Sequence, residues 1–103
     1  MYEVERALLE GKPEVRIGDK VYAVDDRMST FARMNRALGD AQTELSEFGI
    51  ILEHGLSKEA AAEIEEMDLS FAAMHSVVLL VMAAMQGVGE EEARRRFRSN
   101  EEK

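Results

Sequence analysis

Residues 57–86, SKEAAAEIEEMDLSFAAMHSVVLLVMAAMQ, decide the fold of this chain. The alanine- and glutamate-rich first part opens on a serine that can cap a helix, and it predicts a helix over 57–67. The second part predicts a helix over 69–86 whose central part contains only two polar residues, His75 and Ser76. A helix that is apolar on almost every side must be covered from more than one direction. A chain of this size can supply part of that cover, so we expect another copy or a partner to supply the rest.

Length, composition and charge limit the possible classes of protein. With 103 residues the chain has room for a single domain, residues 1–103, with one modest core. Hydrophobic residues make up 46% and charged residues 33%, a balance typical of a folded soluble domain. The net charge of −8 repels phosphate backbones and anionic membrane surfaces, so we expect no nucleic acid and no membrane as partners. Because the chain has no cysteine, disulfides, thiol nucleophiles and cysteine-based metal sites are excluded.

No targeting segment is apparent in the sequence. The first ten residues carry three glutamates and one arginine, which is the reverse of the basic start of a signal peptide. The longest apolar run, residues 77–85, is far shorter than the roughly 20 residues that cross a bilayer. We therefore expect an intracellular protein in which this run belongs to a buried helix.

Residues 14–24 predict a β-hairpin with its turn at Gly18 and Asp19. This turn places Val15 opposite Tyr22. Two strands alone are only marginally stable in water, so we expect their apolar face to lie against helices or to join strands of another subunit. That face consists of Val15, Ile17, Tyr22 and Val24.

A helix is predicted over residues 28–54, with a break or bend near Gly39 because glycine inside a helix costs about 1 kcal/mol relative to alanine. Asp25, Asp26 and Ser29 carry the side-chain oxygens that cap a helix start. Apolar residues recur within this segment at alternating spacings of three and four, which is a coiled-coil-like seam. They are Phe31, Met34, Leu38, Ala41, Leu45, Phe48 and Leu52.

The two ends of the chain have weaker patterns. Residues 1–13 predict a short helix or an arm, residues 90–98 a charged helix, and residues 99–103 a frayed tail. Three glutamates stand four residues before three arginines in the charged helix, a spacing that stabilises it by roughly 0.2–0.5 kcal/mol per pair. The arginines could form an RNA-binding patch, but the glutamates neutralise them, and we favour a salt-bridged helix. The sequence thus predicts a mainly α fold with a short N-terminal β-hairpin (α+β) and about four helices.

No group of residues suggests chemistry. His54 and His75 lack the spacing of metal ligands, and we expect His75 to pack inside the protein and His54 to lie at a helix end. There is no nucleophile elbow, no glycine-rich phosphate loop and no evident catalytic triad. We therefore expect a chain that is not an enzyme and that has no metal, no cofactor and no small-molecule substrate.

Methionine is frequent, with six residues beyond the first: Met28, Met34, Met67, Met74, Met82 and Met85. Such flexible side chains suit an adaptable surface that holds partner segments of varied sequence. Gap filling in an ordinary small core is an equally good explanation. The apolar helix over 69–86 favours the binding surface.

Four segments carry a resemblance to a known family: IGDKVYAVDD at 17–26, MSTFARMN at 28–35, KEAAAEIEEMDLSF at 58–71, and VMAAMQG at 81–87 followed by residues 91–97. Their order resembles that of the tail assembly chaperones of long-tailed phages and prophages of Gram-positive bacteria. The resemblance covers about residues 15–98 and rests on pattern and order, without a diagnostic catalytic residue.

The resemblance implies a small helical protein that binds the tape-measure protein during tail morphogenesis, in the cytoplasm of the bacterial host. It would keep that long client soluble and leave before the tail is complete, and a frameshift-extended form is common in the family. We expect copies of the chain to form a homo-oligomer. The expected docking residues are Phe71, Met74, Val78, Met82 and Met85. The expected supporting helix presents Phe31, Met34, Leu38, Leu45 and Phe48.

Two other classes of function fit the sequence. One is a structural tail or head-completion subunit, which would form a stable ring without a client. The other is a small acidic helical regulator, similar to an antitoxin or an antirepressor, whose partner would be a basic protein.

Overall fold

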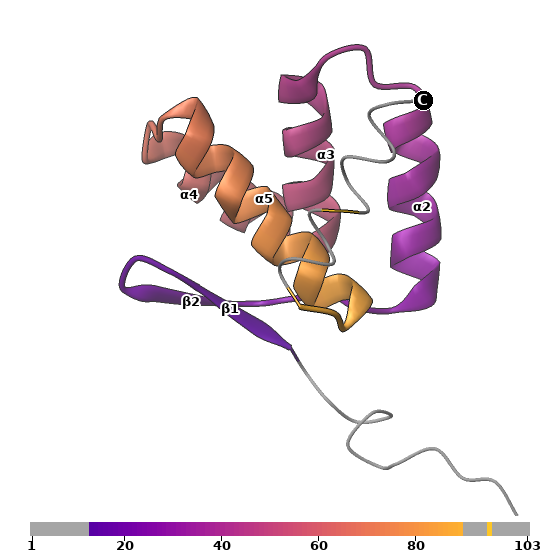
Figure 1. Ribbon diagram of the computed structural model, residues 1–103, viewed down its shortest axis with the longest axis horizontal. Helices are drawn as coiled ribbons and strands as arrows, with labels where there is room; N and C mark the ends of the chain where they lie inside the picture. Colours follow the sequence, from indigo (N-terminus) through magenta and orange to yellow (C-terminus); the bar gives the residue numbers. More distant parts are fainter. Residues whose placement is uncertain (1–12, 90–94, 96–103) are drawn as a thin grey trace, which may run out of the picture.

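The computed structural model describes residues 13–89 and residue 95 (Figure 1). Its elements are, in chain order, β1 (Glu14–Ile17), β2 (Lys20–Ala23), α2 (Met28–Gly39), α3 (Glu44–Gly55), α4 (Lys58–Glu66) and α5 (Phe71–Gln86). The predicted mainly helical fold with a short hairpin is confirmed. The predictions for residues 1–13, 90–98 and 99–103 lie outside the described residues, except for Arg95 and residue 13.

The hairpin has the predicted register. β1 and β2 are antiparallel, and Val15 lies opposite Tyr22. Gly18 in the turn has a φ of +65°, a left-handed conformation that glycine adopts without steric cost. The predicted apolar face is buried, and β1 packs against α5 of the same chain (Figure 1). The hairpin therefore gains its stability from the helices, as two strands require.

The segment predicted as one helix over 28–54 forms two. α2 ends at Gly39 and α3 begins at Glu44, and the two helices pack side by side (Figure 1). Thr43 caps the start of α3, because its side-chain oxygen accepts a hydrogen bond from the backbone N–H of Ser46 at 3.1 Å. The break interrupts the apolar seam. Its member Leu45 is 71% exposed as a result.

Serine caps start the last two helices. Ser57 accepts a hydrogen bond from the backbone N–H of Ala60, and Ser70 accepts one from that of Ala73. α5 ends where Gly87 adopts a φ of +67°, the left-handed cap conformation. Both helices fall within the predicted ranges of 57–67 and 69–86.

This chain covers much of the second half of α5. Six of its residues are buried between α3 and the hairpin: Val78, Leu79, Val81, Met82, Ala83 and Met85. The end of α3 approaches α5 very closely at Gly55, where an added Cβ would lie 2.5 Å from Cγ1 of Val81. The carbonyl oxygen of Gly55 also accepts a hydrogen bond from the backbone N–H of Asp25 at 2.8 Å. The core forms around the hairpin, α3 and the second half of α5, and it also includes Met34 of α2 and the buried side of α4.

Candidate docking surface

Three of the five predicted docking residues belong to the core. Val78, Met82 and Met85 are only 0%, 3% and 6% exposed, so no partner reaches them in the folded chain. The prediction of a docking face along the second half of α5 is therefore corrected. The sequence pattern could not indicate that α3 and the hairpin of the same chain cover these residues.

The other two predicted docking residues lie at the start of α5. Phe71, its first residue, is 55% exposed, and Met74 is partly buried against the core. The ring of Phe71 lies against that of the buried Phe48 of α3, with 5.4 Å between the ring centroids and a tilt of 47°. The ring of His75 meets the same Phe48 edge-on at 5.9 Å. Such aromatic pairs contribute about 0.5–1.5 kcal/mol beyond the area they bury, so the contact with Phe48 favours this position of the Phe71 ring.

The predicted supporting residues divide between the core and the surface. Met34 and Phe48 are buried, whereas Phe31 and Leu38 are partly buried against the core. Leu45 is exposed, and it lies on the same side of α3 as Phe48 because residues three apart on a helix are neighbours. The group of residues around Phe71, with the buried Phe48 beneath its exposed members, thus comes from the first halves of α3 and α5. We call it the aromatic patch: Leu45, Phe48, Phe71, Met74 and His75.

The charge of the chain is unevenly distributed around the aromatic patch. Residues 40–89, which contain α3, α4 and α5, carry nine acidic residues and a single basic one, Lys58. Residues 13–39 carry four acidic and five basic residues. The aromatic patch therefore belongs to the acidic part of the molecule.

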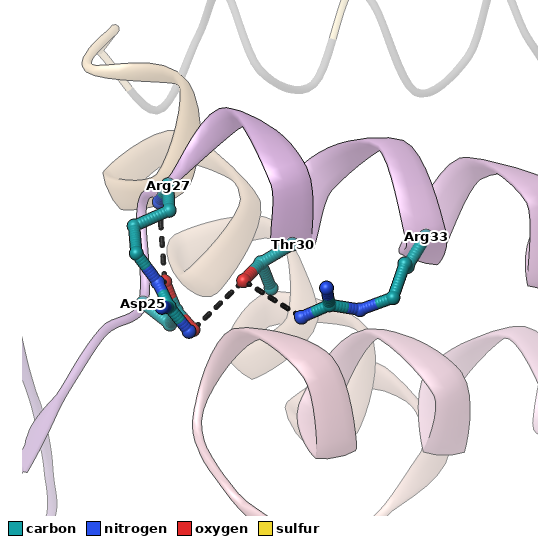
Figure 2. Close-up of polar contacts among 4 residues, drawn as sticks. All are labelled: Asp25, Arg27, Thr30 and Arg33. Atoms are coloured by element: carbon teal, nitrogen blue, oxygen red, sulfur yellow. Dashed lines mark hydrogen bonds and ion pairs between the residues drawn. The ribbon is translucent and has the colours of Figure 1, made fainter.

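Asp25 is the centre of a polar cluster at the start of α2 (Figure 2). Its carboxylate accepts hydrogen bonds from the backbone and the guanidinium of Arg27 and from the hydroxyl of Thr30. Arg33 in turn donates to the Thr30 hydroxyl at 3.3 Å. The hydrogen bonds from the Arg27 side chain, above all, hold the pKa of Asp25 well below its usual range.

The Asp25 cluster is structural. The residue that precedes α2 is Arg27, whose side chain makes no capping bond, so the predicted caps Asp25, Asp26 and Ser29 do not occupy the capping position. Asp25 instead fixes the turn before the helix. Thr30, only 2% exposed, is satisfied by these bonds. With its oxygens used in this way, Asp25 fixes the connection between the hairpin and α2.

A second polar contact attaches the hairpin to α4. The carboxylate of Glu63 accepts hydrogen bonds from Nζ of Lys20 and from the hydroxyl of Tyr22. The bond from Lys20, followed by that from Tyr22, lowers the pKa of Glu63. This contact links β2 with α4, which are far apart in sequence, and it helps to hold the hairpin against α4.

The described residues contain no arrangement that suggests a metal site or a membrane span. Nδ1 of His54 lies 2.8 Å from the carbonyl oxygen of Ile50, at the end of α3 as expected. Within residues 13–89 and 95, no three histidines or carboxylates are grouped to hold a metal ion. No helix in this part of the chain has the length and apolar content needed to cross a bilayer.

No family model matches the chain, and the comparisons with curated proteins and with solved structures gave no significant match.

Proposed function

We propose that the chain is a non-catalytic tail assembly chaperone of a long-tailed phage or prophage, and that it binds the tape-measure protein through the aromatic patch. One observation carries the proposal: Phe71 stands half-exposed on the buried ring of Phe48, and the exposed Leu45 precedes Phe48 by one turn of α3. Large apolar side chains that are exposed next to one another mark interaction sites more often than isolated ones do. The order of the sequence segments supports the class of protein.

The geometry suits a helical client. The aromatic patch lies across two adjacent helix starts, which offers a shallow apolar surface for the apolar side of an amphipathic helix. Because the contact with Phe48 favours one position of the Phe71 ring, binding spends less free energy on ordering that side chain. The small patch gives a weak and reversible contact. A long client presents many such helices, so several copies of the chain along it would keep it soluble together.

Co-expression with the tape-measure protein tests this function. We expect the soluble fraction of the tape-measure protein to rise several-fold with the wild-type chain and to fall to the level without the chain for Phe71→Asp. Met28→Asp is the matched control, because Met28 is 89% exposed at the start of α2, outside the aromatic patch. Circular dichroism of both variants establishes that they fold. If Phe71→Asp supports solubility as well as Met28→Asp does, the aromatic patch is not the client site.

A further inference from the structure

We infer that the segment docking on the aromatic patch is an amphipathic helix with lysines and arginines flanking its apolar side, an inference that rests on the proposed function. The inference specifies the charge of the partner, which apolar contact alone does not determine. The inference depends on the carboxylates that stand beside the patch and on the scarcity of cations around it.

One carboxylate stands at the start of α3 and another in the turn that precedes α5. Glu44 is one helical turn before Phe48 and adjacent in sequence to Leu45, so it stands at the α3 side of the patch. Asp68 lies in the turn between α4 and α5, three residues before Phe71. Both side chains belong to exposed residues. A partner on the patch therefore meets negative charge from two directions.

Neither Glu44 nor Asp68 forms an ion pair with another residue of 13–89. Lys20 pairs with Glu63 and Arg27 with Asp25, so the carboxylate partner in each pair offsets the charge of the cation. Lys58, the single cation of residues 40–89, begins α4, and at 1.5 Å per residue it lies on the order of 12 Å from the end of that helix. That distance exceeds the Debye length of about 8 Å at physiological salt. Within residues 40–89 the balance of charge is therefore strongly negative.

A negative rim around an apolar centre selects its partner by charge. Placing like charges against each other across an interface costs several kcal/mol, whereas opposite charges steer the encounter and fix the orientation. An amphipathic helix with acidic flanks would bring its carboxylates against Glu44 and Asp68. One with basic flanks would place its cations there instead, with the apolar side on Phe71. The acidic rim thus accepts basic amphipathic helices and rejects acidic ones.

The experiment uses three fluorescent helical peptides with the same apolar face and with lysine, glutamine or glutamate on the flanks. Fluorescence anisotropy with the full chain measures their affinities between about 50 and about 300 mM NaCl, a range over which screening weakens exposed charge pairs. We expect the lysine peptide to bind at least about tenfold more tightly than the glutamate peptide at low salt, and this ratio to shrink as salt rises.

Two double variants separate the local rim from the net charge. Glu44→Gln with Asp68→Asn removes the rim, and asparagine tolerates the φ of +50° at position 68. Glu53→Gln with Glu59→Gln removes the same charge from exposed positions elsewhere on α3 and α4. We expect the preference for the lysine peptide to disappear in the first variant and to persist in the second.

The possible outcomes distinguish this inference from the proposed function. Equal affinities for the three peptides, abolished by Phe71→Asp, would overturn the basic partner and leave the docking site intact. An equal loss of the preference for the lysine peptide in both double variants would also overturn the inference, because the net charge of the chain would then explain that preference without the rim. Binding that Phe71→Asp leaves unchanged would overturn the docking site itself. Light scattering that shows a second copy covering the patch in place of any peptide would overturn the inference as well.

Discussion

The close approach of α3 and α5 at Gly55 makes a sharp prediction for Gly55→Ala. An alanine Cβ would lie 2.5 Å from Cγ1 of Val81 and 3.0 Å from Sδ of Met85. The methionine can move aside, but the β-branched valine is stiff and fully buried, so the helices must separate. Such overpacking costs about 1–3 kcal/mol. The gain in helix propensity is small because Gly55 is the last residue of α3.

The expected result is a loss of about 1–2 kcal/mol in the free energy of unfolding, measured by urea denaturation followed by circular dichroism. For a chain of this size it corresponds to a melting temperature lower by roughly 5–10 °C. Gly49→Ala is the matched control in the same helix, because a Cβ there meets nothing within 4 Å. We expect that variant to gain up to about 1 kcal/mol.

A double-mutant cycle with Val81→Ala isolates the clash. Removing the Cγ atoms of Val81 opens the space that the Gly55→Ala methyl requires, so the double variant should be more stable than the sum of the single effects by about 1 kcal/mol. If Gly55→Ala proves as stable as Gly49→Ala, the close contact between α3 and α5 does not exist and the description of the core fails.

Three further predictions follow from the cluster at Asp25, the division between core and patch, and the helix caps. Asp25→Asn should lower the free energy of unfolding by about 2 kcal/mol at neutral pH. Because the folded pKa of Asp25 is lowered, the stability that its carboxylate contributes is present above the unfolded pKa of about 3.9 and is lost as the pH falls below that value. In urea unfolding, the difference in stability between wild type and variant should therefore narrow between about pH 5 and pH 2. Met82→Asp should destabilise the folded chain by about 3 kcal/mol or more because it buries a charge. Phe71→Asp should cost only about 1 kcal/mol. Equal melting temperatures of these two variants would contradict the burial of Met82. Ser57→Ala should cost about 1 kcal/mol through loss of the α4 cap, and the exposed Ser76→Ala serves as its control in thermal unfolding.

Local structure could be predicted well from the sequence. The glycine turn and the alternating apolar residues of the hairpin fix its register, because a shift by one residue would expose the buried face. Ser57 marks the start of α4 and Gly39 the end of α2, and both act through short-range hydrogen bonding or backbone preference. Features of this kind depend on residues close together in the chain, so a single sequence contains them.

The orientation of α5 could not be predicted. A helix that is apolar all round has no pattern that distinguishes its core side from its outer side. The distinction depends on Gly55, which admits α5 close to α3, and on the hairpin that packs from the other side. Sequence reasoning therefore placed Met82 and Met85 on the surface although they are buried.

The exposed part of the candidate site had only faint signals in the sequence. Leu45 fits the apolar seam of the helix before it, yet the break after Gly39 and the new start at Thr43 place it on the surface. Phe71 opens an apolar run and so resembles a core residue. Its serine cap, Ser70, is the one indication that it lies in the first turn at the rim of the fold.

Hydrogen exchange tests the central claim, that the starts of α3 and α5 form the client site. The first turn of a helix is held only by its cap and its first backbone bonds, as Ala73 and Met74 are held by Ser70. Such end turns open readily, so the amides near Phe71 exchange faster than those of the helix interior until a ligand covers them. Exchange is measured on the full chain alone and with the tape-measure protein. We predict slower exchange at residues 44–48 and 71–75 in the complex and no change over the hairpin at 14–23. Protection confined to the hairpin, or none at residues 71–75, would contradict the claim.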